Sequence, residues 1–277
     1  MPDALAPVRP LRKYLKILRV SLVERLTYRA DFFVAMIFRF LPLVTTFLLW
    51  DAVYESSGKK TIVGFTHDEM LAYLLLVQIS RMFSSMPGLA GGIAQDIRDG
   101  NLKKYLLQPI DMTAYLLAYR GAHKMAYIAT SILPYGLLFA WFHEVFPPFP
   151  DALTFLAYLT SLVLAFLLGF FFEAAIGMVG FWLLEVTSFL YIVNTLNFFI
   201  SGQMFPIDLL PRPLVVALKA LPFPYLAYWP AMVFLGKVRG PELAFGLLWE
   251  LVWVIVLMGI TRLLYRRGLR YYGAYGG

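Results

Sequence analysis

Hydrophobic residues are gathered into long stretches with few charged positions, and these stretches predict the architecture. The first runs over residues 32–53, the second over 70–89, the third over about 113–142 and the last over 243–264. A bilayer core of ~30 Å requires about 20 apolar residues in a helix. Each stretch is therefore long enough to cross a membrane once, and together they predict four membrane-spanning helices.

A further apolar region, residues 152–205, is too long for one crossing. Its only charged residues are Glu173 and Glu185. At a rise of ~1.5 Å per residue, one helix over this region would be about 80 Å long, so the chain must fold back. Gly180, Trp182 and Glu185 coincide where we expect the break. The region thus predicts two spans, and the expected fold is an all-α integral membrane protein with six transmembrane helices.

Composition and charge agree with this reading. The chain of 277 residues is 60% hydrophobic and only 15% charged, which excludes an ordinary soluble enzyme. The formal net charge of +7 would suit nucleic acid, but the cations flank the spans: 16 Lys and Arg lie on one side and six on the other. Since cytoplasmic loops are enriched in Lys and Arg, both termini are predicted to be cytoplasmic, and no nucleic-acid partner is expected.

The basic N-terminal segment, about residues 10–28, is predicted to be an interfacial helix. Leucines recur at helical spacing among basic residues, at Leu11, Leu15, Leu18 and Leu22. Such a pattern is typical of a helix lying on the cytoplasmic leaflet, although a solvated basic tail would share it. No signal peptide is recognisable, because an early apolar core and a small-residue cleavage site are missing.

The cytoplasmic loop after the second span contains a candidate partner-binding helix, at about residues 94–108. Gly100 can release one helix and Pro109 limits the next, while Leu102 and Leu106 share a face of the short helix at 101–107. The apolar stripe could contact a partner protein. An ordinary polar connector is the alternative.

A proline-rich external region, about residues 206–236, follows the fifth span. It has six prolines between residues 206 and 230 but is also rich in Leu, Phe, Tyr and Trp. We interpret it as two short helices, roughly 209–221 and 225–235, that dip into the outer leaflet where protein covers them. A proline-rich loop on the lipid surface is the alternative.

Just before this region, Met204, Phe205 and Pro206 lie where the chain must leave its helix. Bulky apolar residues at this point could close an exit by excluding water. The alternative is simple packing against the re-entrant helices.

Three charged residues inside the spans form a candidate cluster, namely Arg39, Arg81 and Glu173. All three are expected roughly 10–12 Å deep on the cytoplasmic side, where an unpaired charge is costly. Gly169 and Gly177 flank Glu173 at four-residue spacing, so another helix can approach that face closely. Glu173 is predicted to pair with Arg39 or Arg81, either as an internal brace or as the polar floor of an inward cavity.

Motifs for catalysis are missing. Neither Gly58-Lys59-Lys60 nor Gly236-Lys237-Val238 has the Gly-x4-Gly-Lys-Ser/Thr context of a phosphate-binding loop. His143-Glu144 lacks the second histidine of a zinc protease, the three histidines are scattered, and there is no cysteine. A non-catalytic chain without metal or cofactor is therefore expected. An ion-coupled secondary transporter would be expected to contain an internal repeat, which is not visible, and a lipid-modifying membrane enzyme remains a further alternative.

Taken in order, these segments identify a family. The chain resembles the permease subunits of bacterial ABC exporters of the second type, those with six spans and a separate ATPase. The resemblance covers nearly the whole chain. It rests on residues 28–32 (Tyr-Arg-Ala-Asp-Phe), 50–54 (Trp-Asp-Ala-Val-Tyr), 96–102 (Asp-Ile-Arg-x-Gly-x-Leu), 106–109 (Leu-Leu-x-Pro), 181–182 (Phe-Trp), Ser201-Gly202 with Pro206 and Leu210-Pro211, 221–223 (Leu-Pro-Phe), Pro230-Ala231, and Arg270-Tyr271 with Gly276-Gly277.

The resemblance implies a role for each segment. The N-terminal helix would be the interfacial elbow, residues 206–236 the outer re-entrant pair, and the loop around Gly100 the coupling helix. That helix would contact the ATPase through Asp96, Arg98, Gly100, Leu102, Leu106 and Pro109.

The resemblance also implies the assembly. Two permeases, identical or paralogous, would work with two ATPase subunits that bind ATP and Mg, in a bacterial inner membrane. The high aromatic content favours an amphipathic, drug-like or lipid-like cargo, although aromatic residues facing the bilayer would give the same composition.

Overall fold

The computed structural model describes residues 14–20, 23, 30–183 and 186–272, and residues 14–20 are helical. The remainder of the predicted elbow lies outside the described residues. The α-helices that follow are α2 (Ala30–Ser57), α3 (His67–Ser84), α4 (Leu89–Arg98), α5 (Lys103–Leu106), α6 (Met112–Trp141), α7 (Ala152–Met178), α8 (Thr187–Ile200), α9 (Arg212–Lys219), α10 (Tyr228–Phe234) and α11 (Pro241–Tyr272).

Short elements connect these helices. An antiparallel hairpin joins α2 to α3, with β1 (Thr61–Ile62) paired to β2 (Phe65–Thr66). Val63 and Gly64 form its turn with φ of 47° and 79°, the left-handed values that two-residue hairpin turns favour. The 3₁₀ turns are η1 (His143–Val145), η2 (Val179–Phe181), η3 (Ile207–Leu209) and η4 (Phe223–Leu226).

The backbone forms two compact units. One comprises residues 1–38 and 102–140, whose largest described element is α6. The other comprises residues 39–101 and 141–277, with α3, α4 and α7–α11. The second unit holds most of the described buried residues and most of the contacts considered below.

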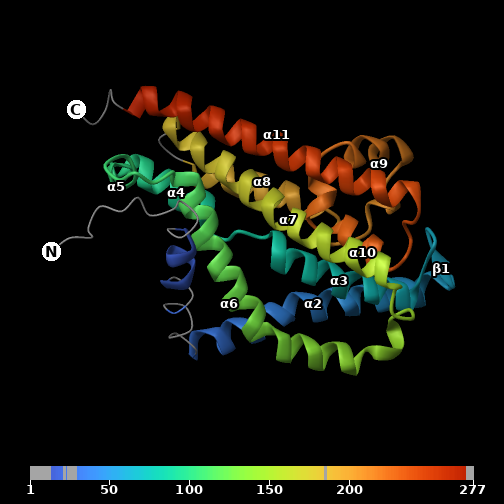
Figure 1. Ribbon diagram of the computed structural model, residues 1–277. Helices are drawn as coiled ribbons and strands as arrows, with labels where there is room; N and C mark the ends of the chain where they lie inside the picture. Colours follow the sequence, from blue (N-terminus) through green and yellow to red (C-terminus); the bar gives the residue numbers. More distant parts are fainter. Residues whose placement is uncertain (1–13, 21–22, 24–29, 184–185, 273–277) are drawn as a thin grey trace. The chain divides into compact units, whose positions relative to one another are not determined.

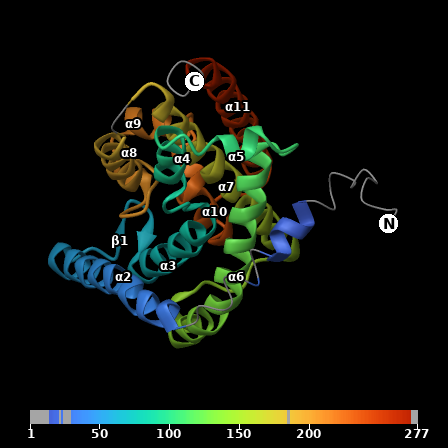
Figure 2. The same ribbon diagram turned by 90° about the vertical axis from the view of Figure 1, so that its left-hand side faces the viewer.

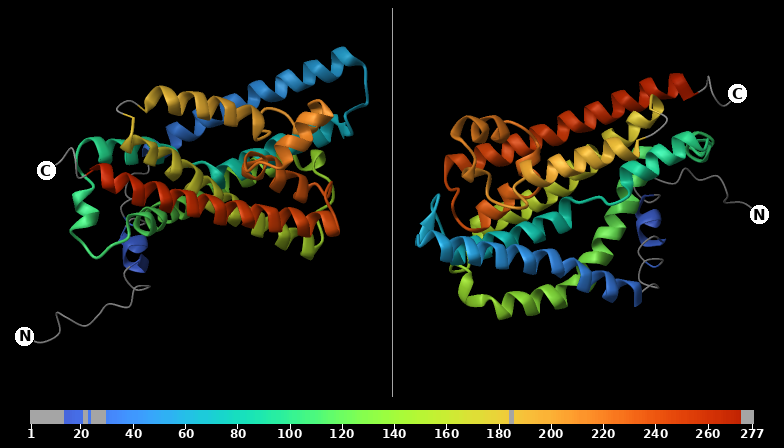
Figure 3. Two further views of the ribbon diagram at one scale, coloured as in Figure 1. Left: turned by 90° about the horizontal axis from the view of Figure 1, so that it is seen from above. Right: turned by 180° about the vertical axis from the view of Figure 1, so that it is seen from behind.

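Helix α7 is the centre of the second unit, where it packs against α11 on one side and α3 and α4 on another (Figure 1). Two hydrogen bonds between α7 and α11 occur in the same order along both helices. Ser161 of α7 is hydrogen-bonded to Glu250 of α11, and further along both helices Thr261 Oγ1 of α11 donates to the Phe171 carbonyl of α7 at 3.0 Å. The two helices therefore run parallel, and they lie side by side from above and from behind (Figure 3).

The contact of α7 with α3 and α4 depends on glycine. A Cβ on Gly169 would overlap the carbonyl oxygen of Ser84, and a Cβ on Gly177 would lie 2.8 Å from that of Ala90. The backbones are thus close enough that only glycine fits at these positions. Ser84 lies against Gly169, and the later residue Ala90 lies against the later residue Gly177. Helices α3 and α4 therefore also run parallel to α7.

Helix α8 runs in the opposite direction. Leu190, near its start, lies against Gly91 of α4, whereas Gly202, just after its end, meets Tyr73 of α3. Its first residue follows the end of α7 by a short connection in which Leu184 and Glu185 lie outside the described residues. The chain thus leaves its helix where the sequence predicts a fold-back.

The second apolar stretch is not one continuous helix, contrary to the expectation for residues 70–89. Helix α3 ends at Ser84, and Gly88, with φ of 74°, precedes the start of α4. Ser84 Oγ donates to the Leu226 carbonyl at 2.6 Å and so joins the break to η4. Figure 2 shows α3 beside α10. The sequence carries a signal for this break, because Pro87-Gly88 is a pair typical of turns, but the hydropathy of the whole stretch concealed it.

Two of the described helical segments are long and apolar enough to cross a membrane by themselves, Ala152–Phe181 and Pro241–Tyr272. Helices α2, α3, α6 and α8 occupy the remaining predicted spans. In the external region, α9 and α10 fall within the two predicted short helices, 209–221 and 225–235.

Candidate functional site

The turn after α8, which the sequence predicts to lie on the outer side, is anchored by two buried tyrosines. Tyr73 donates from its hydroxyl to the Gly202 carbonyl at 2.5 Å, and the Tyr228 N–H donates to the Ser201 carbonyl at 3.1 Å. Gly202 has φ of +80°, and a Cβ there would lie 2.7 Å from the Tyr73 hydroxyl. This turn therefore requires glycine.

The proposed gate residues follow this turn directly. Met204 and Phe205 are half-buried, and Pro206 is buried. The Met204 carbonyl is 3.4 Å from the Trp50 indole nitrogen, which joins the turn to the far end of α2. This partial burial is compatible with a gate and equally with simple packing against the predicted re-entrant helices.

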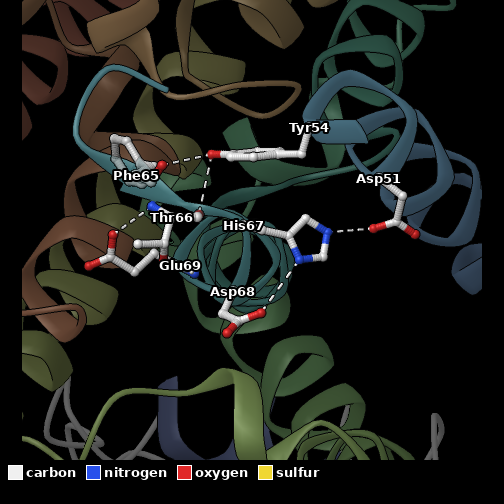
Figure 4. Close-up of polar contacts among 7 residues, drawn as sticks. All are labelled: Asp51, Tyr54, Phe65, Thr66, His67, Asp68 and Glu69. Carbon is white, nitrogen blue, oxygen red and sulfur yellow. Dashed lines mark hydrogen bonds and ion pairs between the residues drawn. The ribbon is translucent and has the colours of Figure 1, made fainter. Parts of the chain in front are cut away.

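A polar cluster links α2 to the hairpin and to the start of α3 (Figure 4). His67 Nε2 lies 2.6 Å from Asp51 Oδ1, and its other ring nitrogen is 3.4 Å from Asp68. The Tyr54 hydroxyl donates to the Phe65 carbonyl at 2.8 Å. Sequence analysis missed this cluster, because its contacts join residues that no motif relates.

At the start of α3, Thr66 and Glu69 form a capping box in which each side chain accepts from the other's backbone N–H. Lys237 reaches the same carboxylate at 2.9 Å and also donates to the Gly64 carbonyl at 2.9 Å. Partial burial alone would raise the pKa of Glu69, but the hydrogen bond from Thr66 N–H and the ammonium of Lys237 outweigh it and lower that pKa.

The stability provided by Glu69 should depend on pH. Because its pKa is lowered by folding, the carboxylate stabilises the fold above its ordinary pKa of 4.5 and loses that contribution as pH falls through the lowered value. We expect Glu69→Gln to lower the unfolding midpoint in detergent at pH 7 but to match the wild type in strong acid. Glu55→Gln, at an exposed position of α2, is the matched control. A difference that persists unchanged in acid would contradict the prediction.

On the opposite, cytoplasmic side of the predicted topology, α4 ends in a tight turn. Asn101 N–H donates to the Asp96 carbonyl at 2.9 Å across Gly100, whose φ is +71°. This is the glycine-dependent termination of a helix that the sequence predicts. Asp96 is half-buried, and the exposed Arg98 lies 3.8 Å from Asp99.

In the other unit, the short helix α5 places the leucines differently from the sequence prediction. Leu102, expected to offer an apolar contact, has no exposed surface, so it belongs to the core. Leu106 is 48% exposed and Leu107 is 83% exposed. The available apolar surface is therefore formed by these two residues, and Pro109 beyond them is exposed. Helical spacing identified a shared face but not which residues the fold covers.

The charged residues within the predicted spans are partly placed by the structure. Arg81 of α3 is half-buried, lies within electrostatic reach of Glu173 of α7, and donates to Ser84 Oγ at 3.3 Å. The side chain of Arg39 lies outside the described residues.

A charged residue near the middle of the last predicted span was overlooked. Glu250 of α11 is fully buried, and its Oε2 lies 2.9 Å from Ser161 Oγ of α7. The only sequence signal is the carboxyl itself, in the middle of an apolar helix. Across the described residues, no group of three or more His, Asp or Glu side chains could hold a metal ion.

A family model described as ABC-2 family transporter protein matches residues 40–276. No curated protein matches the chain. The matched residues include the turn after α8, α4 and α5 with the turn between them, and the parallel helices α3, α7 and α11.

Proposed function

The chain belongs to the ABC-2 family of transporter proteins, and from that membership we propose that it is the permease subunit of an ATP-driven exporter. The family match over residues 40–276 is the observation that carries the proposal. Export would move an amphipathic, drug-like or lipid-like substrate outward through a bacterial inner membrane. ATP and Mg would bind a separate ATPase, because this sequence contains no phosphate-binding loop.

The proposed topology has six spans, α2, α3, α6, α7, α8 and α11, with both termini cytoplasmic. It requires the second, fourth and sixth spans to run inward and the fifth to run outward. The parallel packing of α3, α7 and α11, with α8 opposed to them, supports this order. Residues 206–236 would then lie in the outer leaflet.

Coupling to the ATPase is assigned to α4, the turn at Gly100 and α5. Leu106 and Leu107 of this segment offer exposed apolar surface next to the basic residues Lys103 and Lys104. Apolar side chains at the centre of a contact, with charges at its rim, are typical of transient protein interfaces. The working unit would contain two permeases, as a homodimer or a heterodimer.

Co-purification tests the proposal. The tagged chain should be co-expressed with a candidate ATPase subunit from the same organism. The ATPase should co-purify with the tagged chain, and the complex should hydrolyse ATP after reconstitution in lipid. Leu107→Asp should reduce both at least about tenfold, because a charge would be buried at the contact, while membrane insertion stays intact.

Lys60→Asp is the control. It introduces the same carboxylate at an exposed residue on the predicted external side, and it should leave ATPase retention and ATP hydrolysis unchanged. Retention of the ATPase at wild-type levels by Leu107→Asp would remove α5 from the contact. Failure of the unmodified chain to retain any ATPase would overturn the proposed function itself.

A further inference from the structure

Glu250 lies inside the second unit, between α7 and α11. It is one helical turn beyond Gly246, and its side chain has no exposed surface. One carboxyl oxygen, Oε2, lies 2.9 Å from Ser161 Oγ. The other, Oε1, is buried and has no hydrogen-bond partner. A buried carboxyl that uses only one of its two oxygens requires an explanation.

Three residues with polar but uncharged side chains are placed near Glu250 by their positions and contacts, namely Trp229, Tyr158 and Tyr225. The Trp229 indole lies directly over Gly246, where any Cβ would overlap its ring. Tyr158 is one turn before Ser161 on α7, and Tyr225 lies within electrostatic reach of Glu250. The Tyr158 hydroxyl and the Trp229 Nε1 are themselves buried without hydrogen-bond partners.

Charge compensation is missing from this site. Among the described residues, no Lys, Arg or His forms an ion pair with Glu250. Hydroxyl and indole groups can donate hydrogen bonds, but they carry no positive charge that would balance a carboxylate. An ionised carboxylate sealed among such groups would be far less stable than the neutral acid.

We propose that Glu250 is a proton-binding site, and that its carboxyl carries a bound proton in the folded chain at neutral pH. The proton removes the charge and converts one oxygen into a donor, so that the acid can donate as well as accept. Ser161 then joins α7 to α11 through a hydrogen bond between neutral groups. This inference requires a buried position but does not rest on transport or on the ATPase.

Infrared spectroscopy tests the proton directly. Purified full-length chain in lipid at pH 7 should show the carbonyl stretch of a protonated carboxylic acid, and Glu250→Gln should remove that band. Glu242→Gln, at the exposed start of α11, should instead remove carboxylate bands. Loss of carboxylate bands in Glu250→Gln, with no change in the acid region, would overturn the proposal.

Paired variants provide a second measurement. Glutamine is neutral and nearly the same shape as protonated glutamate, so Glu250→Gln should keep folded yield within about twofold of the wild type. Glu250→Ala leaves Ser161 unpartnered and opens a void, and should lower the yield at least about fivefold. If Glu250→Gln is as damaging as Glu250→Ala, or does not fold, the negative charge is required and the bound proton is excluded.

Discussion

Gly169→Val is expected to prevent the second unit from reaching its folded state. A Cβ at this position would overlap the Ser84 carbonyl oxygen, which belongs to the backbone and cannot rotate away as a side chain could. Helices α3 and α7 would have to separate, and the contacts of α4 with α7 would be lost with them. We expect a cost at or beyond the upper end of the ~1–3 kcal/mol typical of overpacking.

Size-exclusion chromatography of detergent-solubilised protein, combined with its unfolding midpoint, measures this effect. The loss of folded protein should increase as the added Cβ comes closer to its neighbour. Gly169→Ala should be the most harmful of three alanine variants, and Gly177→Ala, whose Cβ would lie 2.8 Å from the Ala90 carbonyl, should be less harmful. Gly259→Ala should be harmless, because nothing lies within 4 Å of its Cβ. Gly259→Val is the matched control for Gly169→Val. A monodisperse Gly169→Val protein with the wild-type midpoint would show that α3 and α7 do not approach as described.

Charge reversal at Glu173 is expected to have the second large effect. In Glu173→Arg, two guanidinium groups would lie within electrostatic reach of each other inside the proposed span. Their repulsion adds to the cost of a charge in the membrane, which is at least ~2.5 kcal/mol. We expect little folded protein from this variant, whereas neutral Glu173→Gln should be milder.

The double variant Arg81→Glu with Glu173→Arg restores opposite charges and should recover most of the folded yield. The same folded-yield assay on Arg39→Glu with Glu173→Arg distinguishes the second partner that the sequence allows. Recovery in that combination instead would assign the pair to Arg39. Recovery in neither would mean that Glu173 is not held by a cation, and the predicted pairing would be wrong.

Much of the helical order can be predicted from the sequence because hydropathy acts locally. Residues 113–142 and 243–264 read as long apolar stretches, and α6 and α11 occupy them. The break between α3 and α4 is not visible in hydropathy, although Pro87-Gly88 marks it locally. Its long-range contact, from Ser84 to Leu226 142 residues away in the chain, could not be predicted.

The candidate sites were predictable to a smaller extent. Gly100 could be identified from local turn chemistry, and the Gly169–Gly177 face from helical spacing. Leu102 was misplaced because periodicity does not say which face the fold covers. Glu250 escaped notice because averaging over an apolar helix hides one carboxyl, and its partner Ser161 is 89 residues earlier.

The parallel contact of α7 with α11 has a consequence for biosynthesis. Its hydrogen bonds join residues 89 and 90 positions apart, and α11 is the last described helix. During translation, α7 leaves the ribosome well before α11 has been synthesised. Until then, the face of α7 that α11 later covers is exposed to lipid or to the insertion machinery. The contact of α7 with α11 can therefore form only after α11 has been synthesised, so the packing of this part of the bundle is completed late relative to the synthesis of α7.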